Sequence, residues 1–203
     1  MEEFGDDLKE FERKIGVTPG FYKKLINEDD WSFIIKLHAL LEAATTHLLV
    51  FHFQESNLRK VISRLDMSNN QTGKLAFLKE LEMISKRSRR YIRSLSEIRN
   101  SLVHDIRKVE FTLNEYISDY TQQEITRFAK TFSPFEALSI ELKDSKIFGE
   151  EIDTDLTINM LKDRVKNDPK EYIWFGGHSI LVNIMDNHLY SDYLNWQKGK
   201  EFE

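Results

Sequence analysis

The fold is decided by residues 31–53, which read WSFIIKLHALLEAATTHLLVFHF. Apolar side chains recur in this stretch at steps of three and four residues, the spacing at which one face of an α-helix repeats. The preceding Asn27-Glu28-Asp29-Asp30 supplies an N-cap and favours the positive end of a helix dipole. We therefore expect a helix over residues 31–53, with a core-facing stripe that comprises Ile34, Leu37, Leu41, Ala44, Leu48 and Phe51.

The scarcity of glycine and proline extends this helical pattern along the chain. Residues 21–133 contain no proline and one glycine, Gly73, which is typical of helices and rare in sheets built from hairpins. With 203 residues, of which 31% are charged and 12% aromatic, the chain is predicted to form an all-α helical bundle. Residues 135–153 are expected to hold a small hairpin or irregular chain, and further helices are expected over residues 8–15, 57–66, 74–86, 88–109, 114–132, 154–167 and 179–196.

The composition excludes several classes of protein. Without cysteine the chain forms no disulfide, thiolate zinc site, iron–sulfur cluster or cysteine nucleophile. The first residues, Met-Glu-Glu-Phe-Gly-Asp-Asp, lack the basic and then apolar order of a secretory signal, and no membrane span is expected, so the sequence predicts a cytoplasmic protein. The formal net charge of -5 excludes a uniformly basic nucleic-acid binder.

The charge is nevertheless distributed unevenly. Residues 74–109 contain ten Lys and Arg against four Asp and Glu, a net charge of +6, which leaves -11 on the rest of the chain. This segment is either a footprint for the phosphate backbone of RNA or a solvated face that pairs with the acidic remainder. Its densest part, and the predicted RNA-binding set, is Lys86, Arg87, Arg89, Arg90 and Arg93.

The helix expected over residues 88–109 presents polar groups beside its core face. On a helical wheel Arg99 flanks the apolar stripe, and Asn100 and His104 lie one turn apart on the opposite side. From spacing alone, such residues are ordinary surface groups. The stripe itself spans an arc of about 80° and comprises Tyr91, Leu95, Ile98, Leu102, Ile106 and Val109.

The local sequence Ser96-Glu97-Ile98-Arg99-Asn100-Ser101-Leu102-Val103-His104-Asp105 resembles the signature of the HEPN superfamily of helical nucleotide-binding domains. The signature is an arginine, a polar residue and then a histidine, here Arg99, Asn100 and His104. Leu40-Leu41-Glu42 and Leu75-Ala76-Phe77-Leu78 precede it in an order that is similar to the mannitol-repressor-like branch. The resemblance covers roughly residues 30–110.

The resemblance implies a HEPN-like helical bundle with an N-terminal extension over residues 1–110, and a helical C-terminal extension over residues 111–203 packed on the same domain. It further implies a homodimer whose two Arg/His motifs face each other, and a metal-independent endoribonuclease related to toxin–antitoxin or phage-defence systems. His104 would transfer protons, Arg99 would bind phosphate and Asn100 would assist. Glu42 is either an ancillary residue, because an acidic group on this helix pairs with the motif arginine in related domains, or a solubilising group at the edge of the core.

No cofactor is expected, and no metal site. His38 and Glu42 lie one helical turn apart, with His47 and His52 further along, but a metal site needs three or more converging ligands. Whether the chain is an enzyme stays open at this point. The alternatives are a non-catalytic HEPN regulator, linked to transcription regulation and bound to a protein partner, and an antitoxin or immunity protein that binds a basic toxin through the acidic remainder.

Overall fold

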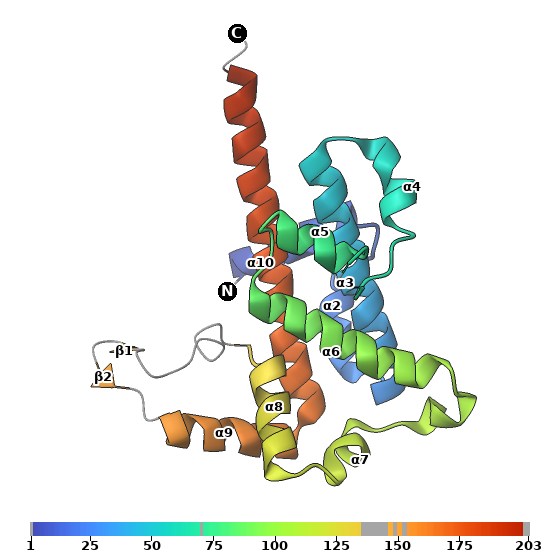
Figure 1. The fold of residues 1–203 in the computed structure, drawn as a ribbon, viewed down its shortest axis with the longest axis vertical. Coiled ribbons are helices and arrows are strands. Elements are labelled where there is room, and N and C mark those ends of the chain that lie inside the picture. The colour runs from blue at the N-terminus through green and yellow to red at the C-terminus, as the bar shows by residue number, and fades with distance from the viewer. Residues whose placement is uncertain (1, 70, 135–145, 148–149, 152–153, 201–203) are drawn as a thin grey trace.

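The structure is a computed structural model, and it describes residues 2–69, 71–134, 146–147, 150–151 and 154–200. The all-α prediction is confirmed, because helices make up most of the chain (Figure 1). The α-helices are α1 (Glu2–Lys14), α2 (Phe21–Lys24), α3 (Asp30–Phe53), α4 (Arg59–Ile62), α5 (Lys74–Glu80), α6 (Lys86–Val103), α7 (Leu113–Ser118), α8 (Gln122–Phe132), α9 (Thr154–Asn167) and α10 (Pro169–Lys200). Shorter elements are the 3-10 turns η1 (Leu25–Asn27), η2 (Ser56–Leu58) and η3 (Ile106–Glu110), and the antiparallel pair β1 (Lys146–Ile147) and β2 (Glu150–Glu151).

The central element is α3, which begins where the acidic cap predicts. Asp29 accepts a hydrogen bond from the backbone N of Ser32 at 2.8 Å. The expected stripe from Ile34 to Leu48 is buried, but Phe33, Leu40 and Leu49 on other sides of the helix are buried too. The predicted buried stripe was too narrow, because α3 packs against α10, α6, α4 and α5 and so has neighbouring helices on several sides (Figure 1).

α10 begins before the helix expected over residues 179–196 and runs through the glycine pair Gly176 and Gly177. A methyl group on Gly176 would overlap the carbonyl oxygen of Phe132 and lie 2.8 Å from the Tyr91 ring. One on Gly177 would lie 2.9 Å from the Tyr91 hydroxyl. The two glycines therefore mark the place where α10 comes closest to α6 and α8, and the predicted start at Ser179 was wrong.

Two buried tyrosines use this close approach to donate hydrogen bonds to α10. The Tyr91 hydroxyl of α6 donates to the carbonyl oxygen of Ile173 at 2.7 Å, and the Tyr22 hydroxyl of α2 donates to that of Trp174. Burial raises the pKa of both tyrosines above the usual range, so both hydroxyls keep their protons. These bonds satisfy groups that would otherwise be buried without a partner.

The helix that carries the motif ends earlier than the wheel predicts. α6 stops at Val103, and the backbone of Asp105 is extended. The Asp105 carboxylate accepts a hydrogen bond from the backbone N of Arg107 and caps the start of η3. Ile106 and Val109 were expected in the buried stripe, but they are 82% and 50% exposed. The other four members of the stripe, Tyr91, Leu95, Ile98 and Leu102, are buried as predicted.

Local caps also divide other predicted helices. Residues 114–132 form α7 and α8 rather than one helix, because Thr121 makes a capping box with Glu124. The helix expected over 74–86 ends at Glu80, and Ser85 caps the next one. Of residues 57–66 only α4 is an α-helix, whereas α9 has the predicted bounds. Apart from β1 and β2, residues 135–145, 148–149 and 152–153 lie outside the described residues.

One hydrophobic core spans both parts of the chain on either side of residue 110. It includes Leu41 and Leu95 from the first part, and Val165, Ile173 and Ile184 from the second. In Figure 1, α10 passes behind α6 and alongside α3. The described residues after position 110 therefore contribute side chains to the same core that surrounds α3.

α3 is also long and apolar enough to cross a membrane, judged by length and composition alone. In the structure, 67% of its most apolar window is buried inside the protein. A helix that other helices surround passes the same test, and the packing of α3 is of this kind.

A hydrogen-bonded chain of Arg59, His47 and His188 links α4, α3 and α10. The Arg59 guanidinium lies 3.4 Å from Nδ1 of His47, and the two Nε2 atoms of His47 and His188 are 3.2 Å apart. A guanidinium only donates, so neutral His47 carries its proton on Nε2 and donates it to His188. Burial, followed by the charges of nearby cations, lowers the pKa of His47 to about 4.

The glycine contact can be tested by Gly176→Ala. We expect the free energy of unfolding to fall by about 3 kcal/mol, because the added methyl group meets a backbone carbonyl that has no room to move. Urea denaturation measures the change, and Phe175→Ala, at a neighbouring position that is 42% exposed, is the control. Equal stability of both variants would contradict the assigned contact.

The histidine chain predicts a dependence of stability on pH. Unfolded His47 takes up a proton near pH 6.5, whereas folded His47 does so near pH 4. The contribution of neutral His47 to the free energy of unfolding is therefore fully present above pH 6.5 and falls by about 2–3 kcal/mol as the pH drops to 4. Below pH 4 this group causes no further change. Urea denaturation from pH 4 to 7.5 should show a shallower fall for His47→Gln than for the wild type and His52→Gln, and parallel profiles would contradict it.

Candidate functional site

The motif residues Arg99 and Asn100 line a pocket of about 220 Å³ beside the C-terminal half of α6. The facing wall is α3, and the third wall is the loop over residues 63–68. The pocket thus joins the predicted ancillary residue Glu42 to the motif, although 57 positions separate Glu42 from Arg99. Its other lining residues are His38, Ser63, Arg64, Leu65, Asp66, Met67, Ser68 and Ser96.

Arg99 is half-buried and makes no ion pair with any residue in the described part of the chain. Its guanidinium donates a hydrogen bond to the neutral side-chain oxygen of Asn100 at 3.0 Å. A guanidinium keeps its charge at any relevant pH and offers several donors in one plane. Arg99 is therefore charged and has donors to offer to a ligand in the pocket.

Glu42 pairs with Lys74 rather than with the motif arginine. Lys74 is fully buried, and its Nζ lies 2.6 Å from a Glu42 carboxylate oxygen. The same ammonium donates to the carbonyl oxygens of Leu65 at 3.0 Å and Ser63 at 3.4 Å. This correction to the expected Glu42–Arg99 pair has a simple cause: the lysine satisfies the carboxylate and also fixes the loop that forms the pocket wall.

The second acidic group of the pocket, Asp66, is also engaged. Its carboxylate accepts from the backbone N of Ser68 at 2.8 Å and from that of Asn69 at 2.6 Å. Gly73 closes the loop, since a side chain there would lie 2.6 Å from the carbonyl oxygen of Asn69. Both carboxylates of the pocket thus have partners, whereas Arg99 and Arg64 form no ion pair with an acidic residue among those that the structure describes.

His38 is a pocket residue that the sequence analysis considered only as a metal ligand. Its Nε2 lies 3.0 Å from the Ser96 hydroxyl, which donates to the carbonyl oxygen of Ile92 at 2.8 Å. Because that hydroxyl hydrogen is used, Nε2 is the donor and Nδ1 is the basic nitrogen. Burial lowers the pKa of His38, with the Arg99 charge acting in the same direction, so the imidazole is neutral at pH 7.

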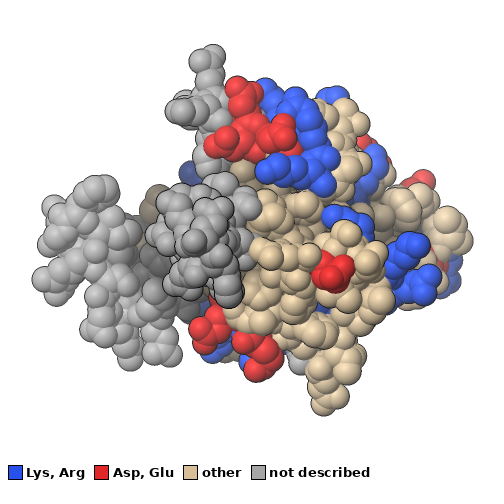
Figure 2. Space-filling view, turned by 90° about the horizontal axis from the view of Figure 1, so that it is seen from above, with Lys and Arg blue, Asp and Glu red and all other residues tan. Residues whose placement is uncertain are grey.

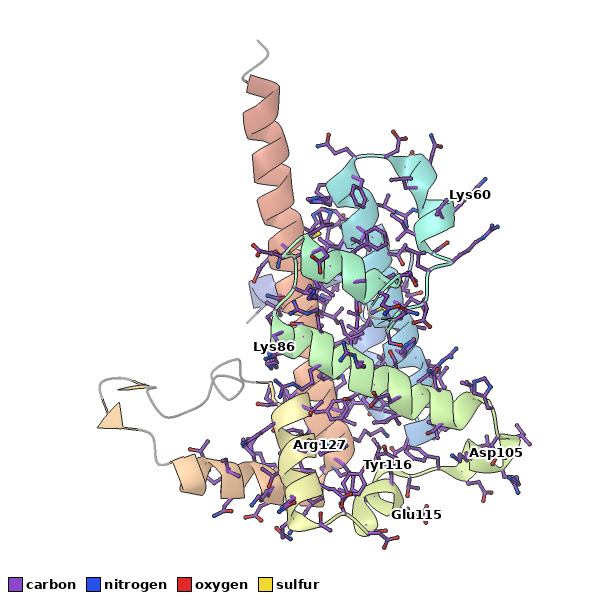
Figure 3. All side chains as sticks on the ribbon, viewed as in Figure 1. Lys60, Lys86, Asp105, Glu115, Tyr116 and Arg127 are labelled. Carbon is purple, nitrogen blue, oxygen red and sulfur yellow. The ribbon has the colours of Figure 1, made fainter. Side chains whose placement is uncertain are left out.

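His104 lies outside this pocket. It follows the last residue of α6 and is exposed, so Arg99 and His104 of one chain do not line the same pocket. Figure 3 shows Asp105, the next residue, at the outer end of the molecule beyond α6. The structure therefore brings together Arg99, Asn100 and Glu42, and leaves His104 at an exposed helix end next to Ile106.

The five predicted RNA-binding cations do not form one exposed row. Arg87 is 3% exposed and donates to the carbonyl oxygen of Ser133 and, at 3.2 Å, to the Ser179 hydroxyl, so it holds helices together and is not available to phosphate. Arg89 is half-buried and donates to the carbonyl oxygen of Ile84. The other three are Lys86, which is exposed, and Arg90 and Arg93, which are half-buried.

The wider positive segment is also divided by internal contacts. Lys74, Lys79 and Arg107 form ion pairs with acidic residues, and Lys108 donates to a carbonyl oxygen of α6. Figure 2 shows the Lys and Arg side chains of one face in separate groups, with uncharged surface between them. The uneven charge of the sequence therefore does not translate into one continuous basic surface on that face.

Within the described residues, no three His, Asp or Glu side chains are grouped in a way that could hold a metal ion. His47 and His188 adjoin each other, but the neighbouring Arg59 places the His47 proton on Nε2, where a metal would bind.

Comparisons with known proteins give no relative for this chain. No protein-family model, curated protein or solved structure matches it. The geometry of the site is then the basis for its function: around a small pocket lie a neutral histidine, an amide and a half-buried arginine that pairs with no acidic group in the described part of the chain. Such a set can bind an oxyanion and transfer a proton beside it.

The buried lysine can be tested by Lys74→Met, which keeps the length of the side chain and removes the charge. We expect the free energy of unfolding to fall by about 2–3 kcal/mol, because Glu42 and two loop carbonyls lose their donor. Backbone amides of residues 63–69 should exchange hydrogen faster. Lys79→Met, which breaks an exposed pair with Glu80, should change stability by less than about 0.5 kcal/mol. Equal effects of the two variants would contradict the role of Lys74.

Proposed function

We propose that the chain is a metal-independent endoribonuclease of the HEPN type that binds RNA phosphate with Arg99. The observation that carries this proposal is the state of Arg99: it lines a pocket, it is half-buried, and none of the described acidic residues pairs with it. A desolvated arginine without an acidic partner favours a ligand with negative charge, and a planar guanidinium matches phosphate oxygens. The likeness of Arg99, Asn100 and His104 to the HEPN signature selects RNA among such ligands.

The chemistry needs two proton transfers and one stabilised anion. The 2′-oxygen of a ribose attacks the adjacent phosphorus, the bond from phosphorus to the 5′-oxygen breaks, and the products carry a 2′,3′-cyclic phosphate and a 5′-hydroxyl. A base accepts the proton of the 2′-hydroxyl, and an acid returns one to the leaving oxygen. Arg99 would stabilise the charge on the phosphorus oxygens, and His104 would transfer the protons.

A second copy of the chain is part of the proposal. In one chain His104 is exposed and lies outside the Arg99 pocket, so the proton-transfer group and the phosphate-binding group lack a common enclosure. Ile106, 82% exposed, and Val109, 50% exposed, lie two and five positions after His104. These are two exposed apolar side chains on a segment that also carries Arg107 and Lys108. Exposed apolar side chains favour a protein neighbour, and a symmetric one would place two motifs face to face.

The same two exposed apolar side chains favour a second candidate function, a non-catalytic module that binds a different protein through Ile106 and Val109. The pocket would then serve to position α6 and the loop over residues 63–68. The two functions differ in a measurable way, since only the first requires cleavage of RNA.

The nuclease proposal is tested with purified full-length protein and an unstructured RNA in the presence of a metal chelator. We expect cleavage that leaves 2′,3′-cyclic phosphate ends, reduced at least about 100-fold by His104→Ala and by Arg99→Ala. His52→Ala and Lys60→Ala, which lie far from α6 in sequence and remove the same kinds of side chain or charge, are the controls. Ile106→Glu should convert a dimer to a monomer, measured by sedimentation, and abolish cleavage in parallel.

Intact RNA with the wild-type protein would overturn the nuclease assignment, as would His104→Ala and Arg99→Ala variants that cut at the wild-type rate. Cleavage by a monomeric Ile106→Glu variant would overturn the requirement for a second copy. Binding of another protein that Ile106→Glu removes, without cleavage by the wild type, would support the second candidate function instead.

A further inference from the structure

A second pocket, of about 120 Å³, lies on the side of α6 that faces α7 and α8. Buried Ile98, Phe128 and Phe132 form its apolar part, together with Thr131. Figure 3 shows the labelled Tyr116 and Arg127 on this side of α6. The remaining lining residues are Ser94, Glu97, Tyr120 and Glu124, and none of the ten belongs to the Arg99 pocket.

Aromatic rings make up one wall of this pocket. The ring centroids of Tyr116 and Tyr120 are 5.6 Å apart, and those of Tyr120 and Phe128 are 6.3 Å apart. Burial, together with a hydrogen bond to Tyr116, raises the pKa of Tyr120 well above its usual range, so the Tyr120 ring presents a neutral phenol. The faces of such rings carry partial negative charge, which attracts cations.

The rim of the pocket adds net negative charge. Glu97 of α6 is exposed and makes no ion pair with any described residue. Hydrogen bonds from the backbone N and hydroxyl of Thr121 lower the pKa of Glu124. Arg127 lies three positions further along α8, so the formal charges of these two residues cancel. The net negative charge of the rim is therefore that of Glu97, which lies across the pocket from α8.

We propose that this pocket binds an organic cation, a guanidinium or ammonium group, which lies against Tyr116 and Tyr120 and pairs with Glu97. The aromatic wall and the unpaired carboxylate attract the same ligand, whereas a phosphate would meet two carboxylates and one arginine. The cation belongs either to a small amine or to a Lys or Arg side chain of a protein partner. The site does not depend on the proposed ribonuclease activity, since it shares no residue with the Arg99 pocket.

Binding is measured by calorimetry on the full-length protein with choline, with agmatine and with a short peptide that contains one arginine between glycines. We expect saturable binding with a dissociation constant of about 1 mM or tighter for at least one of them. Glu97→Gln and Tyr116→Leu should each weaken it about threefold to fivefold. Glu115→Gln, which removes a carboxylate of α7 outside the pocket, should leave it unchanged.

The source of the cation follows from the comparison of the probes. A peptide that binds at least about tenfold more tightly than agmatine assigns a protein side chain, and equal affinities assign a small amine. The proposal is overturned if none of the three cations shows saturable binding. It is equally overturned if Glu97→Gln and Tyr116→Leu both bind as the wild type does, or if uridine monophosphate competes for the same site.

Discussion

The arrangement of the helices depends on the contact of α10 with α6 and α8 at Gly176 and Gly177. There α10 is close enough for Tyr91 and Tyr22 to donate hydrogen bonds to its carbonyl oxygens, and any side chain in the glycine positions would fill that space. The contact sets the approach of α10 to α6 at this point, and α3 packs against both helices. Because α6 carries Arg99 on one side and Glu97 on another, the same contact sets the position of both pockets.

Much of this fold follows from local sequence, and the errors have identifiable physical causes. The apolar period and the acidic cap predict α3 nearly to the residue, and the proline after Asp168 predicts the end of α9. The end of α6 could not be read from the apolar stripe, because the Asp105 carboxylate competes for a backbone N–H two positions on. The start of α10 was misplaced because its glycines serve a tertiary contact rather than a turn.

The candidate site was only partly predictable. Arg99, Asn100 and Glu42 line one pocket, in keeping with a motif whose residues are close on one helix and a facing residue on another. Lys74 was missed as the partner of Glu42, because no periodicity relates residues 32 positions apart. The burial of Arg87 was missed because a run of cations in sequence does not reveal that one of them points between helices.

The way in which Lys74 holds the loop over residues 63–68 has a consequence for the thermodynamics of ligand entry. Each of its three hydrogen bonds is formed inside a single chain, and the Asp66 carboxylate ties the same loop to itself. An anion that reaches Arg99 therefore meets walls that need no further loss of conformational entropy. The free energy of association is then determined chiefly by the exchange of hydration water on the anion for contacts with the guanidinium, and by the ordering of exposed side chains on the rim such as Arg64.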